Sequence, residues 1–170
     1  MKMHMVTSAL LFILIPAIHA QEAVAKAPPQ DTPEVAAKKA VEADLGTRKK
    51  NLIAQSEDME SIAGSLSGFD LDNALAIDDR AEQGMAYLDA TYWFVVTYNR
   101  MQSDEDKNIA KAVLQNRLAF YAHMLDMSVD QTNRSLGLTR LPAVAQQGQR
   151  IRDELRAAKL KLDEIAASLN

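Results

Sequence analysis

The spacing of apolar residues is the clearest structural signal in this sequence, and it is most regular near the C-terminus. From Leu141 onward, apolar or small residues recur in alternating steps of three and four: Val144, Gly148, Ile151, Leu155, Ala158, Leu162, Ile165 and Leu169. Arginine, lysine, aspartate and glutamate occupy many of the positions between them. This heptad spacing predicts a long final helix that packs with coiled-coil geometry.

The first helical stretch shows a narrower apolar stripe, in which Leu45, Leu52 and Met59 recur every seven residues. Its expected start is residues 31–34, where Asp31 or Thr32 can cap the helix and the proline that follows fits the first turn. Two glycines and two serines between residues 64 and 68 interrupt the helical spacing. They predict a loop to the next helix.

The second and third helices are predicted from the same spacing and from their capping residues. The second runs to about residue 101, with Asp70 and Asp72 as candidate caps and a single polar residue, Asp78, on its apolar stripe. The third begins after Ser103, whose hydroxyl is expected to cap it. A wide apolar arc, ending near Gly137, makes this helix look central; it includes Ile109, Val113, Leu114, Leu118 and Phe120.

Short connections between helices of similar length favour antiparallel neighbours. The last helix is expected to start after Thr139 as its cap. Each helix would be about 45 Å long at ~1.5 Å rise per residue. The sequence therefore predicts an all-α antiparallel four-helix bundle of long helices with coiled-coil-like packing, spanning residues 33–170.

The N-terminus is typical of an export signal. Lys2 precedes an apolar run that ends at Ala20, and the polar Gln21 follows. Residues 1–20 are therefore predicted to be a signal peptide cleaved after Ala20, and residues 21–32, with their consecutive prolines, a disordered leader. No later run is apolar for long enough to cross a membrane, so we expect a mature protein in a bacterial periplasm.

Composition excludes several kinds of chemistry. The chain has no cysteine, which rules out disulfides, thiol nucleophiles and thiolate metal sites. A formal net charge of -4 argues against general nucleic-acid binding. Six basic residues between Arg140 and Lys161 are expected to complement the acidic second helix within the bundle; a docking face for an acidic partner or an anionic envelope surface is the alternative.

Candidate catalytic and cofactor groups are few. His123 has no histidine or cysteine partner, so it predicts no catalytic relay, although with a methionine on a facing helix it would suit haem. Asp78 and Asp89 are the acids to consider for an enzyme that uses carboxylates alone. The acidic runs beginning at Asp70 and Asp104 lack the glycine and terminal glutamate of calcium loops and are interpreted as helix caps. No metal and no cofactor is predicted.

The second helix ends in an aromatic stretch that carries no charge between residues 92 and 98. Trp93 points away from both apolar stripes of that helix, so one side of the stretch exceeds what a bundle core needs. Tyr92, Trp93, Tyr98 and Tyr121 are the predicted partner-binding residues. We expect an exported, non-enzymatic binding protein with a protein partner or a second copy of itself; a small-ligand or haem bundle is the alternative, and a carboxylate enzyme is less favoured.

Overall fold

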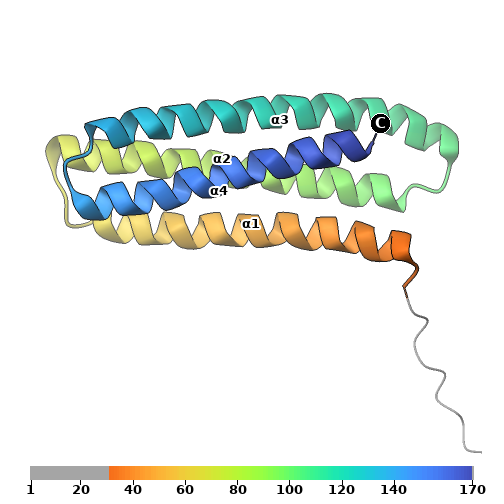
Figure 1. The fold of residues 1–170 in the computed structure, drawn as a ribbon, viewed down its shortest axis with the longest axis horizontal. Coiled ribbons are helices and arrows are strands. Elements are labelled where there is room, and N and C mark those ends of the chain that lie inside the picture. The colour runs from red at the N-terminus through yellow and green to blue at the C-terminus, as the bar shows by residue number, and fades with distance from the viewer. Residues whose placement is uncertain (1–30, 170) are drawn as a thin grey trace, which may run out of the picture. The chain divides into compact units, whose positions relative to one another are not determined.

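A computed structural model describes residues 31–169 and shows four long helices (Figure 1). Their bounds are α1 Pro33–Ala63, α2 Gly68–Arg100, α3 Asp104–Leu138 and α4 Pro142–Ser168. Successive helices run in opposite directions and lie side by side. The predicted all-α antiparallel four-helix bundle is confirmed. The predicted signal peptide and residues 21–30 of the predicted leader lie outside the described residues.

Two of the predicted helix starts are confirmed by their hydrogen bonds. The Thr32 hydroxyl oxygen accepts from the backbone N–H of Val35 at 3.3 Å. The Ser103 hydroxyl oxygen accepts from the backbone N–H of Asp106 at 3.3 Å. In both cases the side chain satisfies an amide that has no partner within the helix, and acidic residues of the first turn complement the helix dipole.

The predicted starts of α2 and α4 are wrong. Helix α2 begins at Gly68, whose φ of 59° suits a residue without Cβ, so Asp70 and Asp72 lie inside the helix. Thr139 follows the end of α3, where its hydroxyl donates to the Ser135 carbonyl at 3.0 Å. Helix α4 starts only at Pro142, which needs no amide partner in the first turn.

The end of α3 also differs from the prediction. The helix continues through Gly137 to Leu138, so this glycine is a helical residue and not a left-handed closing residue. Among the glycines of residues 31–169, Gly68 is the one with positive φ. Three described residues, 139–141, therefore suffice to connect α3 to α4.

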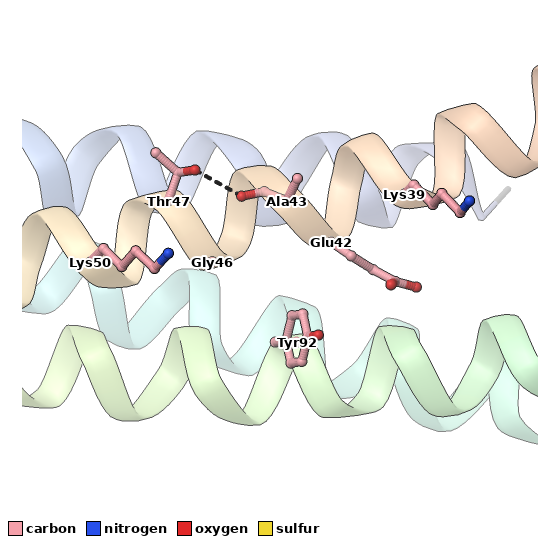
Figure 2. A pocket seen from close by; sticks show the side chains of 7 residues that line it. All are labelled: Lys39, Glu42, Ala43, Gly46, Thr47, Lys50 and Tyr92. Atoms are coloured by element: carbon pink, nitrogen blue, oxygen red, sulfur yellow. Dashed lines mark hydrogen bonds between the residues drawn. The ribbon is translucent and has the colours of Figure 1, made fainter.

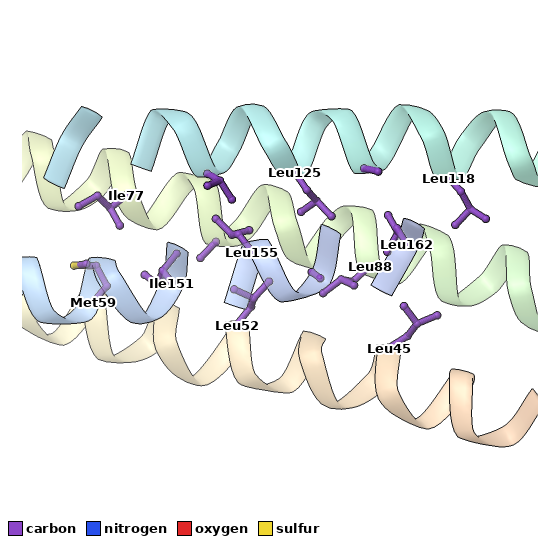
Figure 3. Packing of buried hydrophobic residues seen from close by; sticks show 14 of the residues in the cluster. Leu45, Leu52, Met59, Ile77, Leu88, Leu118, Leu125, Ile151, Leu155 and Leu162 are labelled. Atoms are coloured by element: carbon purple, nitrogen blue, oxygen red, sulfur yellow. The ribbon is translucent and has the colours of Figure 1, made fainter. Parts of the chain in front are cut away.

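The core is built from the heptad positions of all four helices (Figure 3). Every predicted seam position of α4 from Val144 to Ile165 is buried, and Leu155 and Leu162 have no exposed surface. Burial of each such leucine contributes roughly 1.5–3 kcal/mol to folding. The largest fully buried side chains include Leu45, Leu52, Met59, Ile77, Leu88, Leu118, Leu125 and Ile151.

Two glycines allow α2 and α4 to approach each other across the diagonal of the bundle. A Cβ added to Gly84 of α2 would overlap the Leu155 side chain of α4 and lie 3.0 Å from Leu52. A Cβ added to Gly148 of α4 would lie 3.1 Å from the Ile77 side chain of α2. These positions need glycine for packing, although both are in helix interiors where glycine is ordinarily costly.

Buried polar contacts between helices gather toward the end of the bundle that holds loops 64–67 and 139–141. The Ser56 hydroxyl of α1 donates to Asp78 of α2 at 2.6 Å. The Asn73 amide of α2 donates to the Ser135 carbonyl of α3 at 3.0 Å and to the Thr139 hydroxyl. Gln147 of α4 donates to the backbone carbonyl of Gln55 in α1 at 2.8 Å. Each of the four helices is thus held to a neighbour at this end.

Charges of α4 pair mainly within α4 and with α1. Lys161 lies 3.2 Å from Asp44, and Glu154 lies 3.3 Å from Arg48. Lys159 pairs with Asp163 in its own helix at 2.8 Å. Within residues 31–169 no ion pair joins α4 to α2, so the expected pairing of the basic last helix with the acidic second helix is wrong. In that same part of the chain, no helix has an apolar stretch capable of spanning a membrane.

Candidate functional site

Trp93 is the most exposed aromatic side chain of the predicted partner-binding set, with 58% of its surface exposed. The helical period explains its position, because Thr91 and Val95 on either side of it are buried in the core. Trp93 packs edge-on against Tyr92, with ring centroids 5.4 Å apart and an interplanar angle of 80°. The neighbouring tyrosine therefore supports one side of a tryptophan that is otherwise largely exposed.

Tyr92 also lines a groove between α1 and α2 of about 510 Å³ (Figure 2). Its ring projects from α2 toward α1, where Gly46 leaves open space because a Cβ there would meet no atom within 4 Å. The other lining residues are Lys39, Glu42, Ala43, Thr47 and Lys50. An aromatic side, a glycine gap and a charged rim together form a surface suited to a protein segment.

The charged rim of this groove is only partly neutralised within the described chain. Lys39 bonds Asp31 at 2.7 Å, and Glu42 accepts a hydrogen bond from the Asn99 amide at 3.0 Å. Lys50 is exposed and forms no ion pair with any residue from 31 to 169. Lys50 is therefore a positive charge on this rim that the described chain leaves without an ionic partner.

The other two predicted partner-binding residues lie elsewhere. Tyr98 lines a separate cavity at the end of the bundle. Tyr121 stacks on Tyr87 of α2, with centroids 5.4 Å apart and an interplanar angle of 24°, and contacts Phe120 at 5.6 Å. The structure therefore brings Tyr92 and Trp93 together and divides the four predicted residues among three places.

The outer face of α3 carries apolar residues for which the sequence pattern predicts burial in the core. Ile109, Val113 and Phe120 are 65%, 48% and 50% exposed, so their predicted burial is wrong. Leu114, Leu118 and Leu125 form the buried seam of α3, and the three exposed residues fall on the opposite side of that helix. The sequence does indicate this exposure: Ile109, Val113 and Phe120 are spaced by four and seven residues and form a second stripe, distinct from the buried seam.

A buried carboxylate lies between α1 and α2. Asp78 is 6% exposed, and its carboxylate accepts the hydrogen bond from Ser56. Burial raises the pKa of Asp78, the Ser56 hydrogen bond opposes that shift, and the neighbouring Glu60, Glu82 and Asp79 raise the pKa further. Carboxylate oxygens of Glu60, Asp78 and Glu82 lie within 4.8 Å of one another. Within residues 31–169, these three carboxylates are close enough together to share a cation.

The groups considered for catalysis or haem are separated. Asp89 is 45% exposed and pairs with Lys49, eleven residues along α2 from the buried Asp78. The two acids are thus in different surroundings and do not form a pair. His123 lies on the exposed side of α3, whereas Met59 is fully buried in the core. Because His123 is exposed, its imidazole does not lie among the buried core residues where a haem between helices would need its ligand.

No model of a known protein family, no curated protein and no solved structure matches this chain.

Proposed function

We propose that this chain is an exported, non-enzymatic helical-bundle protein that acts by binding another protein. The contact surface is the groove between α1 and α2 together with Trp93, which contacts the groove residue Tyr92, hereafter the Trp93 surface. The exposure of Trp93 is the observation that carries the proposal, since a tryptophan in a long-helix bundle is ordinarily placed where its large apolar ring leaves water.

The chemistry of the Trp93 surface supports a protein partner. Tryptophan and tyrosine are enriched among the residues that dominate protein interfaces, because they combine a large contact area with a polar tip. Tyr92 already orients the indole ring, so binding would cost little additional side-chain entropy at this point. Lys50 supplies an unpaired charge at the rim, where electrostatic complementarity selects partners.

We expect Trp93→Ala to weaken association without unfolding the chain. Loss of an interface anchor should lower affinity at least about tenfold, whereas the melting temperature should change little because the side chain is mostly exposed.

A crosslinked pull-down from the native periplasm, with residues 21–170 as bait, would identify a partner. Light scattering of the same chain, with Trp93 fluorescence as a readout, would detect self-association.

Phe69→Ala is the matched control for the Trp93 experiment. Phe69 also lies on α2 and is also 58% exposed, but it is near the start of the helix and far along it from Trp93. It should leave binding unchanged. If both variants bind as tightly as the parent chain, Trp93 is not part of a binding surface. A loss of ~3–5 kcal/mol in stability on Trp93→Ala would instead identify Trp93 as a core residue.

Export is part of the same proposal and rests on the sequence of residues 1–20. We expect the mature protein to begin at Gln21, since Ala20 is the last small residue before the change in polarity. Mass spectrometry of the protein recovered from the periplasm gives the mass of the mature chain. An intact Met1 in a membrane fraction would contradict both cleavage and the periplasmic location.

A further inference from the structure

A second concave site lies where the N-terminal part of α1, the C-terminal parts of α2 and α4, and the N-terminal part of α3 meet. The cavity has a volume of about 520 Å³ and is lined by residues from all four helices. Cavities of roughly 300–1,000 Å³ between bundle helices are typical of small-molecule sites. It shares no lining residue with the Trp93 surface.

The walls of this end cavity are apolar in their interior and polar at the rim. Val95, Leu114 and Ile165 are buried core residues that form its inner side. Tyr98 and Lys111, both half-buried, bring a hydroxyl and an ammonium group to the same cavity. An occupant would therefore meet hydrocarbon on one side and hydrogen-bond donors on the other.

The charged side chains that line the cavity within residues 31–169 are both basic. They are Lys38 and Lys111, and no acidic side chain from this part of the chain lines the cavity. Lys38 bonds Glu34 at 2.6 Å, so its charge is largely balanced. The Lys111 ammonium group forms no ion pair or hydrogen bond with any residue in the described part of the chain. An unpaired ammonium beside an apolar cavity favours a ligand that joins an anion to a hydrocarbon chain.

We propose that the end cavity binds a single-chain carboxylate amphiphile, such as a medium-chain fatty acid. The hydrocarbon chain packs against Val95, Leu114 and Ile165, and Lys111 pairs with the carboxylate. Tyr98 lines the same cavity and offers its hydroxyl as a second donor to that carboxylate. This site goes beyond the proposed protein binding, because ligand uptake here does not require the Trp93 surface.

Calorimetric titration of residues 21–170 with octanoate, decanoate and decanol tests the proposal. Each buried methylene contributes about 0.8 kcal/mol, so decanoate should bind about fifteenfold more tightly than octanoate. Decanol, which has the same chain without the charge, should bind more weakly than decanoate. Absence of saturable binding by decanoate, or equal affinity for decanoate and decanol, would overturn the proposal.

Lys111→Gln tests the contribution of the ammonium charge separately from that of the apolar cavity walls. We expect this variant to lose the preference for decanoate over decanol, with a drop of at least about tenfold in decanoate affinity and unchanged decanol affinity. Lys50→Gln is the control, because Lys50 is likewise unpaired within residues 31–169 but lines the other groove. Melting curves verify that both variants fold. Equal decanoate binding by Lys111→Gln and the parent chain, or an equal loss in both variants, contradicts the assigned role of Lys111.

Discussion

Replacement of Leu155 or Leu162 by aspartate is expected to unfold the bundle. Both leucines have no exposed surface and occupy the seam of α4, where a carboxylate would lose the apolar contacts and find no partner. Removal of a buried leucine side chain alone costs about 2–5 kcal/mol, and an unpaired charge adds to that cost. The sum approaches the ~5–15 kcal/mol that stabilises a typical domain.

Circular dichroism of the purified variants measures this effect, and Lys159→Asp is the matched control. Lys159 lies in the same helix, between the two leucines, and makes a partly exposed ion pair with Asp163. Loss of such a pair costs at most about 1 kcal/mol, so its melting temperature should remain within several degrees of the parent value. Similar behaviour of all three aspartate variants would show that the heptad register of α4 is wrong.

Asp78→Asn is expected to stabilise the bundle near neutral pH. The buried carboxylate lacks a cationic partner within the described chain and faces Glu60 on α1 and Glu82 on α2, with Asp79 beside it. An asparagine keeps an oxygen for the Ser56 hydroxyl but removes the buried charge and its repulsion. The free energy of unfolding at pH 7 should therefore rise by about 2 kcal/mol.

The pH dependence of the Asp78→Asn effect has a defined sign. Because the pKa of Asp78 is raised in the folded state, the native protein holds this proton more tightly than the unfolded chain does. The contribution of protonated Asp78 to stability is complete below the ordinary aspartate pKa of about 3.9 and is lost as pH rises through the raised value. The free energy of unfolding of Asp78→Asn should therefore exceed that of the parent chain increasingly as pH rises from about 3.9 through the raised pKa of Asp78. Above that pKa the difference should stay constant.

Denaturant unfolding of both chains at several pH values checks this expectation. Asp89→Asn is the control, since Asp89 is an exposed acid of the same helix that already pairs with Lys49. It should change stability by less than about 1 kcal/mol. If Asp78→Asn lowers stability at neutral pH, the Ser56 bond to the carboxylate outweighs the burial cost and our account of the pair is incorrect.

The parts of the fold that the sequence predicted depend on one helix at a time. The buried seam of α4 follows from the spacing of its own residues, and the caps at Thr32 and Ser103 bond amides three residues away. Exposure of Trp93 follows from the same local geometry, because it lies off the apolar stripes of α2. The seam, the caps and the exposure of Trp93 can all be predicted without knowing how the four helices are arranged around one another.

The parts that could not be predicted depend on neighbours distant in sequence. Thr139 could cap a helix, but the arrival of Asn73 from α2 and the carbonyl of Ser135 give its hydroxyl other partners. The separation of Tyr98 from Tyr121 depends on how α2 and α3 align along their length, since Tyr121 stacks on Tyr87, eleven residues before Tyr98 in α2. Burial of Asp78 was visible as a polar residue on an apolar stripe, but its Ser56 partner lies on another helix.

The two ends of the bundle differ in how easily their helices can separate locally. Near loops 64–67 and 139–141, a local separation of helices must break the buried contacts made by Ser56, Asn73 and Gln147. At the opposite end, the walls around Leu114 already enclose an open cavity, and the hydrogen bond from Asn99 to Glu42 between α2 and α1 is only partly buried. Amide hydrogens in the last turns of α4 should therefore exchange with solvent through small local openings, whereas those around Asp78 require disruption of most of the bundle. A ligand in the cavity would remove this difference by raising the cost of opening at the less stable end.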